Sequence, residues 1–133
     1  MSLLIALTLT LATPPLPDAP IDSFEPTVRR QFEEAIGQID AAPDDGDACG
    51  ALGMLYHAYE MYDLALACYE RASALDEGDW RWRYGAAIML ADVGRPDEAR
   101  AAFDDVLQAV PEHSAARLRR ADIDREDGRY DVC

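Results

Sequence analysis

The sequence predicts an all-α domain built from stacked, antiparallel helical hairpins. From Ser23 onward, apolar residues recur at helical spacing, and no segment alternates apolar and polar residues as a half-buried strand would. The same pattern then returns after about 34 residues, an interval long enough for one helical hairpin. Half of the residues are apolar, so the chain can fill a packed core.

The repeat becomes visible when three segments are aligned: YDLALACYERA, PDEARAAFDDV and the shorter C-terminal RYDVC. Ala65 then coincides with Ala99, and Tyr69 coincides with Phe103. A small residue therefore recurs where two helices approach closely, and a bulky apolar residue recurs where space must be filled beside the next hairpin. The shared register of three segments carries more weight than any single position.

This pattern resembles the tetratricopeptide repeat, which runs W-x2-L-G-x2-Y, then A-x3-F, then P. The matching residues of the first full repeat, 46–79, are Leu52, Gly53, Tyr56, Ala65 and Tyr69, with Cys49 in place of Trp and Glu77 in place of Pro. Those of the second, 80–113, are Ala86, Ala87, Leu90, Ala99, Phe103 and Pro111. The resemblance covers residues 46–133 and implies a right-handed stack of about two full repeats with a half-repeat on either side.

We expect six helices, near residues 25–41, 46–59, 62–76, 80–92, 96–109 and 113–126. Ser23 is the expected cap of the first helix, with Pro26 in its first turn. This amphipathic helix should behave as the second half of a preceding repeat and cover the first full hairpin. Gly94 ends the fourth helix and Pro96 opens the fifth, while Glu60 and Gly128 hold places equivalent to Gly94.

The last expected helix is much more polar than the others, as suits an end helix that faces solvent. The partial repeat 114–133 stops at Cys133, where a further second helix would begin. Two interpretations stay open: a truncated product, or a frayed end.

The N-terminal residues 1–12 contain the apolar run SLLIALTLTLA, which is shorter than the roughly 20 apolar residues that span a bilayer. The run has the length of a signal-peptide core, and Ala12 is a possible cleavage site, although no basic residue precedes it. We therefore expect export to the periplasm or the cell exterior. The alternatives are a cytoplasmic chain with an apolar N-terminal helix, or a misplaced start codon. Residues 13–22 are rich in Pro and should form an extended linker to the helical domain, 23–133.

The net charge is −14, and the 12 basic residues are all Arg. An acidic field repels phosphate backbones and anionic lipid, so nucleic acid is not an expected partner, and membrane contact is not expected outside the leader. Acidity maintains solubility, or it attracts a basic partner.

No group of residues in the sequence is typical of catalysis or of a cofactor or metal site. His57 has no catalytic partner at a suitable spacing, and Cys68 lies in an apolar helix as a small core residue. The three Cys are irregularly spaced and form neither a disulfide framework nor a zinc motif. The acidic run 122–128 departs from a calcium loop because its Gly comes late and no ligating Glu follows. We therefore expect no enzyme activity, no metal and no cofactor.

We expect a protein-interaction scaffold or adaptor, and the alternative is a detached regulatory segment of a larger enzyme or redox protein. The resemblance implies that the first helix of each hairpin lines a binding groove. The residues that this places in the groove are Met54, His57, Ala58, Arg81, Tyr84, Ile88, Leu118, Asp122 and Arg125. Gly50, Met54, Tyr84 and Leu118 stand where some members hold a terminal carboxylate with Lys and Asn. We therefore expect an apolar or weakly basic protein or peptide partner.

Overall fold

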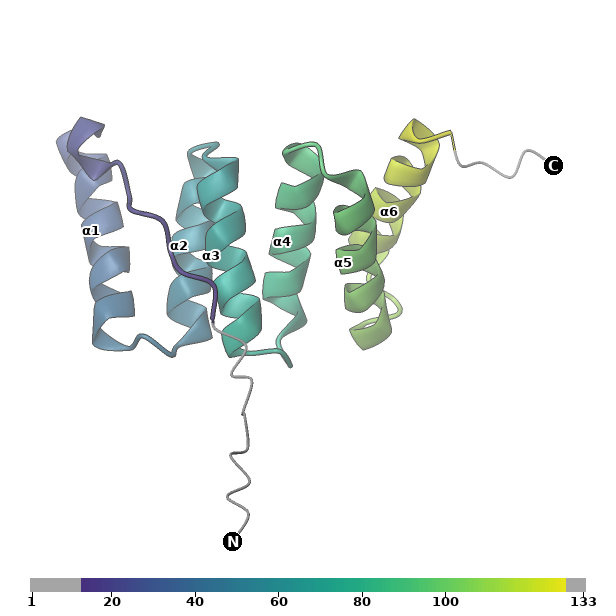
Figure 1. Cartoon of the computed structure of the whole chain (residues 1–133), viewed down its shortest axis with the longest axis horizontal. Coiled ribbons are helices and arrows are strands. Elements are labelled where there is room, and N and C mark those ends of the chain that lie inside the picture. Colours follow the sequence, from purple (N-terminus) through teal and green to yellow (C-terminus); the bar gives the residue numbers. More distant parts are fainter. Residues whose placement is uncertain (1–12, 129–133) are drawn as a thin grey trace, which may run out of the picture.

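The computed structural model describes residues 13–128, which contain six α-helices, one short 3-10 turn and no strand. The elements are η1 (Ile21–Ser23), α1 (Pro26–Ala41), α2 (Gly46–Ala58), α3 (Tyr62–Leu75), α4 (Trp80–Asp92), α5 (Pro96–Ala109) and α6 (Ser114–Glu126). The helices stand side by side along one axis and run alternately up and down (Figure 1). The predicted all-α stack of hairpins is confirmed, and each helix begins and ends within one residue of its expected bounds.

The first helices of the hairpins, α2, α4 and α6, share one capping position, which recurs after about 34 residues. The carboxylates of Asp45 and Asp79 accept hydrogen bonds from backbone N–H groups of α2 and α4, at 2.9 and 3.1 Å. At the same position before α6, His113 Nδ1 accepts from the backbone of Ala116 at 3.1 Å. Helix α1 differs from the expectation, because its cap is Glu25 rather than Ser23.

Ser23 lies too far upstream to cap α1, since it is the last residue of η1, and the extended Phe24 and the cap Glu25 separate it from the helix. Its hydroxyl instead donates to the carbonyl of Pro20 at 2.9 Å.

The turn after the first helix of each hairpin contains a residue in the left-handed region: Glu60 (φ 59°), Gly94 (φ 79°) or Gly128 (φ 65°). After α4, the N–H of Arg95 donates to Leu90 O at 2.8 Å, a bond that closes the helix end. The equivalent bond after α2 runs from the N–H of Met61 to Tyr56 O at 2.9 Å, although Glu60 stands in place of glycine.

The core runs through the whole stack, and the aligned residues of the repeat form its centre. Ala65 and Ala99 are fully buried, and Tyr69 and Phe103 are buried beside them. Small residues therefore lie where the paired helices meet, and large rings fill the space toward the neighbouring hairpin. Helix α6 contributes less, with Ala116 and Ile123 as its buried residues.

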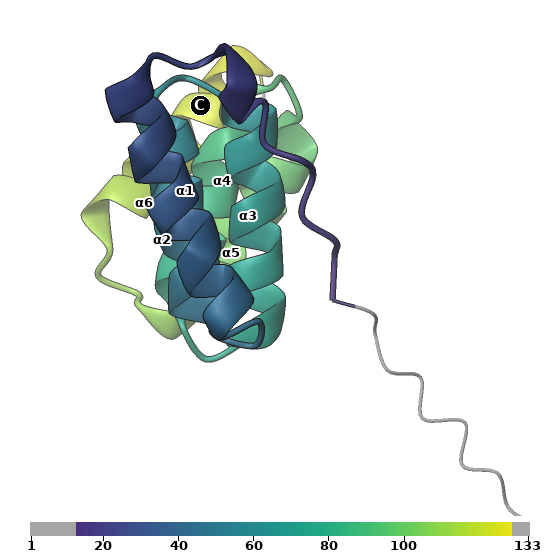
Figure 2. The same cartoon turned by 90° about the vertical axis from the view of Figure 1, so that its left-hand side faces the viewer.

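The chain before α1 lies against the helices (Figures 1 and 2). Arg71 of α3 donates to the carbonyl oxygens of Pro14 and Pro43, at 3.1 and 3.3 Å. Arg29 of α1 donates to three carbonyl oxygens of the same N-terminal segment, that of Ile21 among them at 3.1 Å. The apolar residues of this segment that pack, partly buried, against the core are Leu16, Ala19, Ile21 and Phe24. Residues 13–24 thus follow a defined path across α3 to α1.

The predicted leader, residues 1–12, and residues 129–133 of the partial last repeat lie outside the described residues. Between residues 13 and 128, no helix is both long and apolar enough to cross a membrane.

Candidate partner-binding groove

A groove of about 340 Å³ opens between α2 and α4 and is named here the α2–α4 groove. Its lining residues are Met54, His57, Tyr69, Arg81, Trp82, Tyr84, Gly85 and Ile88. All but Tyr69 belong to first helices of hairpins, so the groove lies on the face that α2 and α4 share.

Glycines make the floor of this groove aromatic. A Cβ atom at Gly53 of α2 or Gly85 of α4 would lie 2.9 or 3.0 Å from the ring of Tyr69. A Cβ atom at Gly50 would lie 2.4 Å from the ring of Trp82. The missing side chains therefore let Tyr69 reach from α3 between the two first helices. There it stacks on Trp82, with ring centroids 6.3 Å apart and an interplanar angle of 17°.

Apolar and aromatic side chains also form the rim. Met54 is 58% exposed, a high value for a large apolar residue. His57 lies edge-on to Tyr69 at 6.5 Å. On the other side, Tyr84 contacts the His113 ring at 4.7 Å, which fixes its orientation at the groove edge. The groove thus offers a rigid apolar surface to solvent, a feature of interaction sites.

Charge at one end of the groove is largely compensated. Arg81 forms ion pairs with Asp79 at 2.6 Å and with Asp47 at 3.2 Å, and its guanidinium lies 4.9 Å from the centre of the Trp82 ring. The hydrogen bond from Arg81 lowers the pKa of Asp79, so this carboxylate stays ionised. Burial, with a smaller effect of Cys68, raises the pKa of Tyr69 to about 12, so the floor stays neutral.

Six of the nine sequence-predicted groove residues gather at this site. Met54, His57, Arg81, Tyr84 and Ile88 line the groove itself, and Ala58 lines a shallow hollow beside Met54 and His57.

The other three predicted residues lie on α6 and do not line the α2–α4 groove. Leu118 is 64% exposed. Asp122 lines a separate hollow of about 200 Å³ together with Arg119. Arg125 forms an ion pair with Asp122 at 2.7 Å.

Three groove residues were missed by sequence reasoning, namely Tyr69, Trp82 and Gly85. Tyr69 was expected only to fill space beside the next hairpin, and both Tyr69 and Trp82 are buried. The available signal was the series Gly50, Gly53 and Gly85, since glycine within a helix leaves space for a close neighbour.

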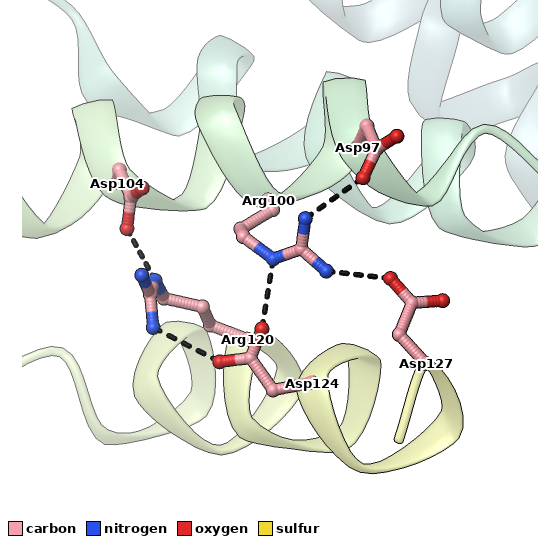
Figure 3. A network of polar contacts seen from close by, with 6 residues as sticks. All are labelled: Asp97, Arg100, Asp104, Arg120, Asp124 and Asp127. Carbon is pink, nitrogen blue, oxygen red and sulfur yellow. Dashed lines mark hydrogen bonds and ion pairs between the residues drawn. The ribbon is translucent and has the colours of Figure 1, made fainter. Parts of the chain in front are cut away.

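Two carboxylates of the acidic run 122–128, those of Asp124 and Asp127, form ion pairs between α5 and α6 (Figure 3). Arg100, only 13% exposed, contacts Asp124 at 2.8 Å, Asp127 at 2.7 Å and Asp97 at 2.8 Å. Arg120 joins the same network by pairing with Asp124 at 3.2 Å. Since α6 buries few apolar residues, this network is a main part of its attachment to α5.

Among residues 13–128, no three potential metal ligands gather at one point. Cys49 and Cys68 are free and buried. Burial raises the pKa of Cys68 to about 12 and also raises that of Cys49, so both remain protonated thiols.

Comparison with known proteins yields no matching family model. The chain is 32% identical over 82 residues to superkiller protein 3 of Schizosaccharomyces pombe, and 28% identical over 103 residues to the peroxisomal targeting signal receptor of Candida glabrata. The solved structure of MamA (MSR-1) matches with a TM-score of 0.68 and 25% identity, over 77% of this chain and 59% of MamA. The chain thus has the tetratricopeptide-type fold, a stack of helical hairpins like that of MamA.

This tetratricopeptide-type chain spans 6% and 17% of the lengths of the two curated relatives, or 59% and 75% of its own length. The Yersinia enterocolitica type III secretion chaperone SycD shares its fold, with a TM-score of 0.70 and 17% identity, over 76% of this chain and 82% of SycD. SycD has been solved in complex with a peptide of the translocator YopD.

Proposed function

We propose that this tetratricopeptide-type chain is a non-catalytic scaffold that binds an apolar segment of a partner protein in the α2–α4 groove. The observation that carries the proposal is the exposed apolar rim above a rigid aromatic floor. Met54 remains 58% exposed in a chain whose net charge is −14. Exposed apolar surface of this kind is costly in water unless a partner covers it.

The groove favours a segment with an apolar centre. Tyr84 is held at the groove edge by its contact with His113, above the stacked and largely buried rings of Tyr69 and Trp82. A ligand therefore meets a rigid surface that loses little freedom on binding. The groove leaves a ligand few polar groups to bind, because its one charged lining residue within the described chain, Arg81, is already paired with two carboxylates. The excess of acidic residues over the chain favours weakly basic flanks on the partner.

Two of the similar proteins support a protein or peptide partner. One curated relative is a targeting signal receptor, and one structural neighbour is a secretion chaperone that was solved with a peptide.

We test the groove with peptides selected from a phage-displayed random library on the immobilised chain. A selected peptide, labelled with fluorescein, is then titrated with each variant and anisotropy is measured. The double variant Met54→Ala with Ile88→Ala should weaken binding about tenfold, as loss of two central apolar contacts does. Leu118→Ala is the matched control, since it removes a similarly exposed apolar side chain outside the groove.

Leu118→Ala should change the affinity less than about twofold, in line with truncations outside a binding centre. If the double variant keeps its helicity and binds as the parent does, the proposed groove is wrong.

We also propose export of the chain, supported by the apolar run in residues 2–12. N-terminal sequencing of the protein produced in a bacterium tests this proposal. An intact Met1 in the soluble cytosolic fraction would contradict it.

A further inference from the structure

The chain fills one of its own surface grooves. Residues 13–24 cross from α3 to α1, opposite α6 in the end-on view of Figure 2. Residues 13–20 adopt no regular secondary structure, and four of the residues between 14 and 20 are Pro. Two arginines hold this extended segment by its carbonyl oxygens: Arg71 bonds Pro14, and Arg29 bonds Ile21 and its neighbours. The surface between the second helices, here the α1–α3 groove, therefore accepts an extended peptide.

The same surface recurs one repeat later between α3 and α5, where no extended segment of residues 13–128 fills it. This α3–α5 groove has a volume of about 550 Å³. It is lined by Pro14, Glu70, Ser73, Ala74, Glu77, Gly78, Trp80, Arg83, Asp105, Gln108 and Ala109. Pro14, at one edge, belongs to the segment that fills the neighbouring groove, so the two surfaces are continuous.

The repeat register reverses the polarity between the two grooves. Asp105 stands at the position of Arg71, about 34 residues on. In the same register Glu70 and Glu77 replace Ile36 and Pro43. The first groove donates hydrogen bonds to carbonyl oxygens, whereas the second presents carboxylates, which accept hydrogen bonds and attract cations.

The charges that line the α3–α5 groove are unequal. Arg83 is the one cation among its lining residues in the described chain, and it pairs with Asp105 at 2.9 Å. Arg95, in the turn after α4, also interacts electrostatically with Glu70. Its ion pair, however, is formed with Glu98 at 2.5 Å, outside the lining of the groove. A surplus of negative charge therefore remains beside Trp80, whose ring is partly exposed.

We propose that the α3–α5 groove is a second docking surface, and that it binds an extended, Pro-containing segment of a partner protein that carries arginines or lysines. The segment would run as residues 13–24 do one repeat earlier, with its cations on Glu70 and Glu77 and its apolar residues on Trp80. Arginine suits this surface because its guanidinium pairs with carboxylates and stacks on an aromatic ring. This surface is separate from the α2–α4 groove, so the two proposals succeed or fail independently.

The probe is a fluorescein-labelled peptide of about twelve residues in which Pro, Ala and Arg alternate, a length that extended chain needs to follow residues 13–24. A matched peptide carries Gln in place of Arg. Fluorescence anisotropy with the full chain at low salt measures both affinities. The Arg peptide should bind at least tenfold more tightly, and added salt should weaken it.

Three variants locate the site, and circular dichroism shows whether each is folded. Glu70→Gln with Glu77→Gln should weaken binding about fivefold or more, because it removes two of the attracting charges. The matched control, Glu33→Gln with Glu34→Gln, removes the same charges from exposed positions on α1 and should have little effect. Ala74→Arg, which fills the groove and adds a cation, should abolish binding.

Equal losses in the two Glu-to-Gln pairs would overturn the proposal, since attraction would then be general to the acidic chain. Undiminished binding by Ala74→Arg would also overturn it. A loss of Arg-peptide binding in the Met54→Ala, Ile88→Ala variant would place the peptide in the α2–α4 groove instead, and likewise refute the second site.

Discussion

Replacing Glu60 by glycine should stabilise the protein, although the change removes a whole side chain. Glu60 has a φ of 59°, in the left-handed region where side chains with a Cβ atom are strained. It is exposed, and within residues 13–128 its side chain makes no hydrogen bond or ion pair. Gly94 and Gly128 hold the equivalent turns at φ values of 79° and 65°. Glycine therefore matches the backbone that Glu60 is forced to adopt.

The expected magnitude is a difference between two effects. A residue with a Cβ atom in the left-handed region costs about 1–2 kcal/mol. Glycine loses more conformational entropy on folding, which costs roughly 0.5–1 kcal/mol. The net gain in the free energy of unfolding is then about 0.5–1 kcal/mol. For a chain of this size it corresponds to an increase of about 2–4 °C in Tm.

Urea unfolding followed by circular dichroism measures this gain, with thermal unfolding as a second measure. Glu60→Gln is the matched control, because it removes the charge and keeps the backbone strain, so its stability should stay near that of the parent. Gly94→Ala should do the opposite and cost about 1 kcal/mol, although a Cβ atom there meets nothing within 4 Å. If Glu60→Gln stabilises as much as Glu60→Gly, charge rather than backbone strain is responsible and the reasoning is wrong.

Three further predictions follow from the polar contacts and the thiols. Arg100→Gln should lower the free energy of unfolding and speed hydrogen exchange in α6, because it breaks the ion pairs of Arg100 with Asp124 and Asp127; unchanged exchange in α6 would contradict this. Cys49 and Cys68 should resist a short pulse of iodoacetamide at pH 8 and react after unfolding, as site-resolved mass spectrometry would show. Asp79→Asn keeps the helix cap and loses the ion pair with Arg81, at a cost of roughly 0.5 kcal/mol at pH 7. Because Arg81 lowers the pKa of Asp79 in the folded state, this difference is fully present above the ordinary value of 3.8, and it should be lost as the pH falls from there through the lowered pKa of the folded state.

The sequence predicted the helices closely because their ends are encoded locally. Asp45 and Asp79 cap the helices that follow them, and Gly94 ends α4 with bonds to nearby carbonyl groups. Residues 13–24 gave no such signal. Their path depends on carbonyl oxygens that two distant arginines bind, and carbonyl groups are common to every sequence.

The groove was predicted in part, since transfer of the repeat register assumes that each first helix faces the same surface. That assumption holds for α2 and α4, whose residues Met54 and Ile88 line one groove. It does not hold for Leu118 of α6, which lies outside that groove. The floor was missed because Tyr69 is both a core residue and a groove residue, and apolar periodicity alone cannot separate these roles.

The repeat separates what holds the fold together from what varies on its surface. Positions that keep their chemistry from one repeat to the next, such as Ala65 and Ala99, are fully buried. Positions that change it, such as Arg71 and Asp105, lie at the two grooves between second helices and give them opposite hydrogen-bonding character. A hairpin stack repeats the contacts between its hairpins and leaves the outward positions free to differ. Departures from the internal register are therefore where binding specificity should be sought in this chain. Because Asp105 is paired with Arg83, the changes that predict a basic ligand are those from Ile36 and Pro43 to Glu70 and Glu77.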